Sequence, residues 1–248
     1  MRHPIDRVDK SINKQCIIGF DIWGTLLDLN KVLETIAYTI AEKLNLDRAL
    51  TVKRVFEVHD EAKKIRRFKP DISPSEVFEV SRRLLADSFN MKLKEIEDVI
   101  ETAFKGASKD IVYGDTIPAL IKLSNMGISM GTVGNVLFWP STYTRILLRE
   151  LGLMNYFEVT VFSDEVGLIK PDRRIYLKFA ELMGSEPSDL IYVGDNVVED
   201  VGGALSAGGF GVLISRKTSR KLIVPELKVA LITDLNDLVE VYNVFCKQ

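Results

Sequence analysis

The chain has 248 residues, of which 46% are hydrophobic and 27% are charged, and its formal net charge is -2. This length suffices for one α/β domain with a sizeable insertion, and the near-neutral charge gives no electrostatic reason to expect a nucleic-acid partner. The sequence shows no apolar run near the ~20 residues of a membrane span, and residues 1–15 lack the apolar core of a secretory signal. We therefore expect a cytoplasmic protein that acts on a small molecule, with no membrane partner and with its oligomeric state open.

The cysteine content excludes a scaffold built on disulfides. The two cysteines, Cys16 and Cys246, are too few for such a framework, and their spacing fits no metal-binding motif. Cys16 lies within an apolar run, and a free cysteine packs like a small apolar side chain. We expect both cysteines to be buried and inert.

The first predicted element is a short apolar strand, residues 16–20, followed directly by Asp21. A short apolar run of this kind is typical of a parallel strand that is buried on both faces. Open α/β sheets bind ligands at the carboxyl ends of their strands, which is where Asp21 would lie. Asp21 is therefore the candidate nucleophile, because its unperturbed pKa of about 3.9 leaves it ionised at neutral pH.

A series of helices is predicted after this strand. Apolar residues recur at helical spacing, which predicts four helices in succession, over residues 31–44, 51–68, 73 onward and 93–104. The third has a sharp start, where Ser73 and Glu76 can form a capping box. A β-α-β crossover needs only about a dozen residues, so we expect residues 30–108 to form a cap domain over the sheet edge. Its hinges would lie near Asn30 and at 106–110.

The remaining chain alternates helices with strands. Helices are expected over 115–125, 140–151, 173–183 and 197–207, strands over 128–133, 159–162, 190–195 and 210–214, and a last strand and helix within 229–244. Such alternation produces right-handed crossovers and a parallel sheet with helices on both faces. We therefore expect an α/β fold with a Rossmann-like, doubly wound parallel sheet in residues 1–29 and 109–248, interrupted by the inserted α-helical cap domain.

Polar side chains recur at or just past the carboxyl ends of several expected strands, and one edge of the sheet would bring them together. Carboxylates are hard oxygen ligands that suit Mg²⁺, and a lysine beside them can offset the charge of a phosphoryl group. The sequence therefore predicts a site for Mg²⁺ and a phosphate group. Its members are Asp21, Gly134, Asn135, Lys170, Asp195 and Asp200.

These residues resemble the four motifs of the haloacid dehalogenase superfamily, and the resemblance covers nearly the whole chain. In chain order, the motifs correspond to Asp21-Ile22-Trp23-Gly24-Thr25, to Gly134-Asn135, to Lys170-Pro171, and to Gly194-Asp195 with Asp200. The helical insertion after the first motif is similar to the cap of the dehalogenase and phosphoglucomutase branches. The resemblance implies a hydrolase with an inserted cap.

The resemblance also implies a role for each residue. Asp21 would attack phosphorus and form an aspartyl-phosphate, with Lys170 as its catalytic partner. Asp21, Asp195 and the backbone carbonyl of Trp23 would hold Mg²⁺. Asp200 would complete and steady this metal site. The substrate would be a small phosphate ester or acyl phosphate, in contact with Thr25, Gly134, Asn135 and Trp23.

Two positions depart from the motifs of superfamily phosphatases. Trp23 replaces the aspartate that protonates the leaving oxygen, and Gly134 replaces the serine or threonine that holds a phosphoryl oxygen. General acid catalysis is typically worth ~10² to 10⁴ in rate. The enzymes named for dehalogenation carry an aromatic residue in place of Trp23, but their fourth motif lacks the Gly-Asp that this chain retains. We predict a Mg²⁺-dependent phosphatase, with 2-haloacid dehalogenation and a catalytically weak or non-catalytic ligand-binding protein as alternatives.

Other suggestive residues are interpreted as structural. His59 lies on the apolar face of a predicted helix without a neighbouring ligand candidate, so we expect it to pack. The basic run at 63–67 could attract an anionic substrate, but acidic residues accompany it, as on an ordinary solvated helix face. Phe138 and Trp139 either line the pocket or pack against the cap.

Overall fold

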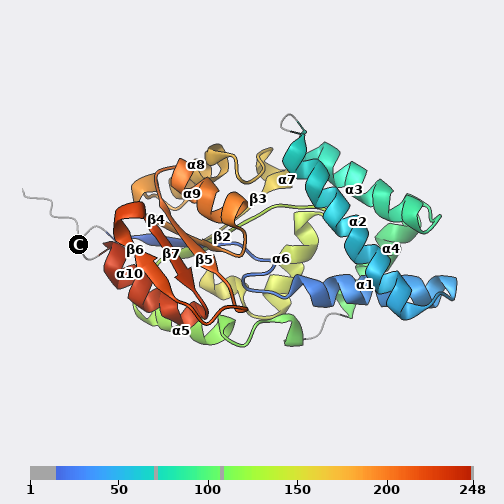
Figure 1. The fold of residues 1–248 in the computed structure, drawn as a ribbon, viewed down its shortest axis with the longest axis horizontal. Helices are drawn as coiled ribbons and strands as arrows, with labels where there is room; N and C mark the ends of the chain where they lie inside the picture. The colour runs from blue at the N-terminus through green and yellow to red at the C-terminus, as the bar shows by residue number, and fades with distance from the viewer. Residues whose placement is uncertain (1–14, 70–71, 107–108, 247–248) are drawn as a thin grey trace, which may run out of the picture.

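The computed structural model describes residues 15–69, 72–106 and 109–246. It shows a mostly parallel β-sheet with helices on both faces, and a second layer of helices beyond one end of the sheet (Figure 1). This is the α/β, Rossmann-like architecture that the alternation of helices and strands predicts. Within the described residues, none of the helices combines the length and the apolar character that crossing a membrane requires.

The strands of the described chain lie in the order β3-β2-β1-β4-β5-β7-β6. The chain winds outward from β1 through β2 and β3, then continues from β4 on the other side of β1. Sheets of this order bind ligands at the carboxyl ends of the strands where the winding reverses, here β1 and β4. The bounds are β1 Ile17–Phe20, β2 Met130–Gly134, β3 Val159–Phe162, β4 Leu190–Gly194, β5 Phe210–Ile214, β6 Leu222–Val224 and β7 Val229–Ile232.

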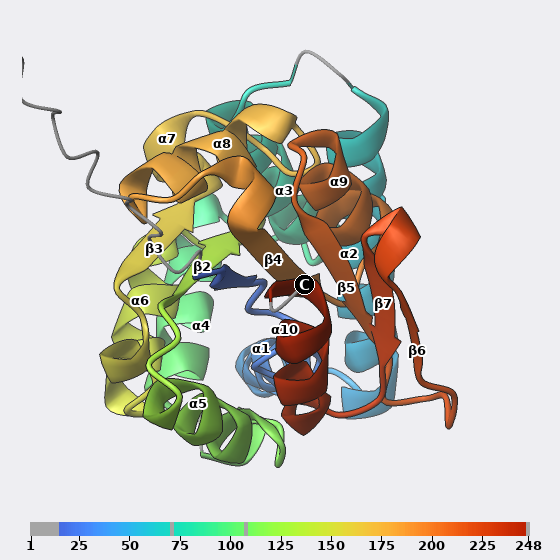
Figure 2. The same ribbon diagram turned by 90° about the vertical axis from the view of Figure 1, so that its left-hand side faces the viewer.

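Helices cover both faces of the sheet (Figure 2). One face is covered by α8 (Arg173–Leu182) and α9 (Gly203–Ser206), and the other by α5 (Thr116–Asn125) and α10 (Leu238–Cys246). β1 shows why both faces need cover, because its side chains alternate between them. Ile17 packs in the core beneath α8, whereas Ile18 and Phe20 pack in the core on the opposite face.

Four helices lie between β1 and β2 in the sequence and pack on one another at the far end of the molecule (Figure 1). They are α1 (Leu29–Leu44), α2 (Arg48–Phe68), α3 (Pro74–Ser88) and α4 (Leu93–Lys105). The predicted start of α3 is confirmed, because Glu76 N donates to Ser73 Oγ at 3.3 Å and Ser73 N donates to Glu76 Oε2 at 2.9 Å. Of the predicted hinge at 106–110, residues 107 and 108 lie outside the described residues.

The sheet differs from the prediction at its edge, where β6 is antiparallel to β7. A tight connection explains this, since parallel neighbours need a long crossover whereas a short turn joins antiparallel strands. The predicted helix over 197–207 is instead a π-helix, η4 (Val197–Gly202), followed by α9. The remaining elements are α6 (Ser141–Glu150), α7 (Ser163–Val166) and the 3-10 turns Lys109–Ile111, Met154–Tyr156, Pro187–Asp189, Pro225–Leu227 and Leu235–Asp237.

The prediction of two inert free cysteines is wrong, because Cys16 and Cys246 form a disulfide. Their Cα atoms lie 5.9 Å apart, although 230 positions separate them in the sequence. Cys16 directly precedes β1, and Cys246 is the last residue of α10, so the packing of α10 against the sheet brings the two together. The bond joins the two ends of the described chain.

Candidate active site

Asp21 lies at the carboxyl end of β1, next to the point where the winding of the sheet reverses. Its backbone N–H donates to Val193 O on β4 at 2.8 Å, which ties the residue to the neighbouring strand. Its carboxylate accepts hydrogen bonds from Lys170 Nζ at 2.6 Å and from Thr25 Oγ1 at 3.3 Å. Burial raises the pKa of Asp21, and the Lys170 ammonium works against that rise. A further cation at this site would favour the ionised form that a nucleophile needs.

Lys170 is almost completely buried, with 2% of its surface exposed. Besides Asp21, its ammonium donates to Asp200 Oδ1 at 2.8 Å and to the Tyr192 hydroxyl at 3.1 Å. Burial by itself lowers the pKa of Lys170, but the charges of Asp200 and Asp21 outweigh it and raise the pKa above its ordinary value. Lys170 is therefore a fixed positive charge rather than a base.

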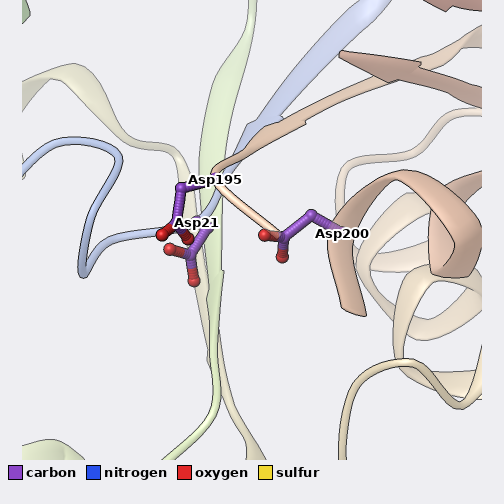
Figure 3. Close-up of side chains that lie close together, drawn as sticks. All are labelled: Asp21, Asp195 and Asp200. Carbon is purple, nitrogen blue, oxygen red and sulfur yellow. The ribbon is translucent and has the colours of Figure 1, made fainter. Parts of the chain in front are cut away.

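Three carboxylates meet at this edge of the sheet (Figure 3). Asp21, Asp195 and Asp200 each offer one oxygen, and these oxygens lie within 4.8 Å of one another. Burial and the Asp200 charge raise the pKa of Asp195, and burial raises the pKa of Asp200 to about 6. Three carboxylates beside the single ammonium of Lys170 leave uncompensated negative charge, which a divalent cation would neutralise.

The donor set fits Mg²⁺, which prefers carboxylate and carbonyl oxygens. The side chain of Asp195 is exposed and forms no ion pair with the described residues, so an ion can reach its carboxylate. The oxygens of Asp200 are already engaged by Lys170 and by Asn196 N, which donates at 2.9 Å. Asp195 is therefore the most accessible of the three carboxylates, and Asp21 and Asp200 lie beside it with Lys170 between them.

Gly24 allows Asp195 to approach the nucleophile loop. Its φ is +92°, in the region that favours glycine, and a Cβ at this position would lie 2.6 Å from Asp195 Oδ2. Any side chain at position 24 would push this carboxylate away from Asp21. The glycine of the first motif is thus required by the carboxylate of the fourth.

Asn135 of the second predicted motif lines the cavity and anchors the backbone of Lys170. Asn135 Nδ2 donates to Lys170 O at 3.1 Å, and Lys170 N donates to Asn135 Oδ1 at 2.9 Å, so this side chain fixes the backbone of Lys170. A Cβ at Gly134 would lie 3.1 Å from two atoms of the Phe162 ring. The Phe162 ring therefore lies close to the position where a serine or threonine side chain would begin.

A cavity of about 540 Å³ opens above these residues, between the sheet edge and α2. Trp23 lines it and packs edge-on against Trp139 and Phe104, with ring centroids 5.4 and 6.4 Å away. Phe138 lines it too and packs against His59 at 5.8 Å. Phe138 and Trp139 therefore do both things that the sequence left open, since they wall the cavity and pack against the helical layer.

His59 packs as predicted, although it also borders the cavity. It is 8% exposed, and burial lowers its pKa to about 4, so it is neutral at pH 7. Its ring rests edge-on against Phe138.

The interpretation of the basic run as a solvated helix face is wrong for Arg66 and Arg67, which bind Glu199, whereas Lys64 is exposed as predicted. Arg66 Nη2 donates to both carboxylate oxygens of Glu199 at 2.6 and 2.8 Å, and Arg67 Nε donates to Glu199 Oε1 at 2.9 Å. The side chains of Arg66 and Glu199 are 8% and 7% exposed. Burial would raise the pKa of Glu199, but the two arginines outweigh it and lower the pKa to about 2. Sequence reasoning missed Glu199, whose only signal is its place directly before Asp200.

Sequence reasoning also missed Arg216, which follows β5. Its guanidinium donates to the carbonyl oxygens of Gly24 at 3.3 Å and Thr25 at 2.8 Å, and to Asp115 Oδ1 at 2.8 Å. The same group lies 3.9 Å from the ring centroid of Tyr113. Arg216 thus holds the loop that carries the candidate nucleophile.

The fold and this arrangement of residues define a class of hydrolase. A family model described as haloacid dehalogenase-like hydrolase matches residues 17–208, well over half of the chain. The chain therefore belongs to the haloacid dehalogenase-like hydrolases, as the four motifs predict.

Relatives with known names support the same class. The chain is 36% identical over 107 residues to a glyceraldehyde 3-phosphate phosphatase of Methanopyrus kandleri, covering 42% of this chain and 43% of the relative. It is 29% identical over 136 residues to a protein of that name from Methanothermobacter thermautotrophicus, covering 52% and 58%. The chain thus spans about half the length of the curated relatives it matches.

Solved structures match over nearly the whole chain. A phosphatase of this superfamily from Thermococcus onnurineus is 27% identical, with a TM-score of 0.64, and the match covers 94% of this chain and 100% of that one. A superfamily hydrolase from Bacillus subtilis bound to magnesium is 17% identical, with a TM-score of 0.72, covering 93% and 99%. At that lower identity the likeness shows the fold alone.

Proposed function

We propose that this protein is a Mg²⁺-dependent phosphatase of small phosphate esters or acyl phosphates, with Asp21 as nucleophile. The observation that carries the proposal is the cluster of Asp21, Asp195 and Asp200 oxygens within 4.8 Å, with Lys170 Nζ bound to two of the three carboxylates. The phosphatase names of the curated relatives agree with it.

In the first step the Asp21 carboxylate attacks phosphorus, and the bond from phosphorus to the ester oxygen breaks. Asp21 then carries an aspartyl-phosphate. Lys170 stays protonated, and its positive charge would stabilise the negative phosphoryl group on Asp21. In the second step water attacks the same phosphorus, which releases inorganic phosphate and restores the Asp21 carboxylate. Asp21, Asp195 and the Trp23 carbonyl would hold Mg²⁺, with Asp200 behind them. When bound, the ion would neutralise charge on the phosphoryl oxygens.

The helical layer is the cap in this proposal, formed by residues 30–108, and the core comprises residues 1–29 and 109–248. Arg66 and Arg67 on α2 bind Glu199, which directly precedes Asp200 in the core. A cap that opened to admit substrate would have to break these ion pairs, of which the one between Arg66 and Glu199 is nearly buried. These contacts join the helical layer to the core beside the cavity.

Dehalogenation of 2-haloacids is the second candidate, and the aromatic wall formed by Trp23 and Trp139 favours it. However, a 2-haloacid carries a carboxylate of its own. Three clustered carboxylates with only one ammonium would repel that group unless a cation were bound. Release of halide from 2-haloacids in EDTA, without release of phosphate from any ester, would establish this alternative.

Binding of Mg²⁺ to the protein tests the proposed phosphatase function directly. Calorimetry should show Mg²⁺ binding to the wild-type protein, and Mg²⁺ should raise its melting temperature because the ion binds only the folded state. Asp195→Asn should weaken this binding strongly. Asp28→Asn is the matched control, since Asp28 lines the same cavity outside the cluster. No binding at millimolar Mg²⁺, with the wild type and Asp195→Asn behaving alike, would contradict the proposal.

With Trp23 in the place of the general acid, the rate of hydrolysis should depend on the leaving group, because an indole cannot protonate the departing oxygen. Esters with weakly basic leaving groups should therefore react fastest. Trp23→Asp should accelerate alkyl phosphates by up to ~10² and change p-nitrophenyl phosphate little. Steady-state rates on the two substrate classes measure this selectivity.

Trp23→Asn is the matched control, because it has the size of the aspartate without its proton. Both variants lose the contacts of Trp23 with Trp139 and Phe104, so their melting temperatures must be compared first. If folded Trp23→Asp and Trp23→Asn had the same rates on alkyl phosphates, position 23 would not be the missing acid site.

A further inference from the structure

The cavity is lined by basic side chains from both layers, and most of them are already neutralised. Lys170 forms ion pairs with Asp21 and Asp200. Arg66 pairs with Glu199, and Arg216 pairs with Asp115. Lys63 and Lys217 also line the cavity, and neither forms a hydrogen bond or ion pair with any residue that the structure describes. Lys217 is exposed at the rim, whereas Lys63 is half-buried.

Lys63 belongs to the face of α2 that is turned toward the cavity. Phe56, His59, Asp60 and Arg66 line the cavity with it, and their spacing of three or four residues places all of them on one side of the helix. The basic run singled out in the sequence therefore has two members, Lys63 and Arg66, above the candidate active site.

Lys63 and the carboxylates of Asp21, Asp195 and Asp200 line the same cavity, Lys63 from α2 and the carboxylates from the sheet edge. A cation in such a place, with no partner among the described residues, is available to an anionic ligand.

Arg66 holds this face of α2 in position. Its Nη2 atom binds both oxygens of Glu199, while its buried Nε has no hydrogen-bond partner among the described residues. The contact of Nη2 with both Glu199 oxygens therefore fixes the guanidinium although Nε lacks a partner. Lys63 lies one turn before Arg66 and is thereby kept over the cavity.

The cavity leaves room for more than the reacting phosphate. Its volume of about 540 Å³ lies within the range of small-molecule pockets, about 300–1,000 Å³. Lys170 lies beside Asp21 on the sheet side of the cavity. Lys63 approaches from the helical layer, so the remainder of the substrate would lie beside it.

We propose that Lys63, positioned through Arg66 and Glu199, forms a second anion subsite. The substrate would then be a phosphate ester that carries another negative group, such as a carboxylate, at a short distance from the phosphate. This inference rests on the proposed phosphatase function, and it narrows the substrate class from small phosphate esters to phosphorylated acids.

The test compares 3-phosphoglycerate with glycerol 3-phosphate, which has a hydroxymethyl group in place of the carboxylate. The wild-type protein should prefer the acid by about tenfold or more in kcat/KM, the effect of one charge-assisted hydrogen bond. Lys63→Gln should remove most of this preference. Lys64→Gln is the matched control, because Lys64 is exposed and does not line the cavity, and it should leave the preference unchanged.

Calorimetry on the Asp21→Asn protein measures the same preference without turnover. Tighter binding of 3-phosphoglycerate than of glycerol 3-phosphate, lost when Lys63→Gln is added, would support the subsite. If the wild-type protein nevertheless hydrolysed no ester, the phosphatase function alone would be overturned. Hydrolysis of p-nitrophenyl phosphate without any preference for the acid would overturn the subsite alone. An equal loss on both esters in Lys63→Gln would also overturn it, because Lys63 would then contact the reacting phosphate.

Discussion

Asp21→Asn should lower phosphate release by at least about 10⁴-fold, the scale on which loss of a catalytic nucleophile acts. The amide has the shape of the carboxylate, but it carries no charge and does not attack phosphorus. It also leaves Lys170 with Asp200 as its one remaining carboxylate partner. Phosphate release from p-nitrophenyl phosphate, with saturating Mg²⁺, measures the effect.

Asp28→Asn is the control for this loss as well. It removes one carboxylate from the same cavity, and asparagine can still accept the hydrogen bond from Asn30 N that caps α1. This variant should keep most of the activity. Both proteins should melt near the wild-type temperature, which separates chemistry from folding. If Asp21→Asn retained most of the wild-type rate, attack by Asp21 would be wrong.

Breaking the disulfide between Cys16 and Cys246 should lower the free energy of unfolding by about 5 kcal/mol. In the chain-entropy view, a cross-link stabilises a protein by restricting its unfolded state, and the effect grows with the length of the closed loop. Here 230 positions separate the two cysteines, so nearly the whole chain is enclosed. Denaturant unfolding of the wild-type protein with and without a reductant measures the difference.

Cys246→Ala separates the cross-link from other effects of the reductant. It should melt at the temperature of the reduced wild type, and the reductant should not change it further. Mass measurement after thiol alkylation confirms which samples are reduced. A reduced wild type with two free thiols and an unchanged unfolding midpoint would show that the cross-link contributes nothing to stability.

The sequence by itself determined the features that depend on neighbours along the chain. Ser73 and Glu76 of the capping box are three positions apart, and apolar residues recur at every helical turn. Both patterns can therefore be recognised without knowledge of the fold. The position of Asp21 just past a buried strand follows from the same local pattern, and parallel strands carry such residues to one edge. The sheet, the helical layer and the three clustered carboxylates were therefore predictable.

Only the tertiary structure decided which distant groups meet. Glu199 and Arg66 are 133 positions apart, and each alone is an ordinary charged residue; their pairing depends on how α2 lies over the sheet edge. The two cysteines pair for the same kind of reason. The packing of α10 against the sheet brings them together, and no local sequence pattern predicts that contact. Local propensity acts over a few residues, whereas long-range contacts arise from the burial of whole faces.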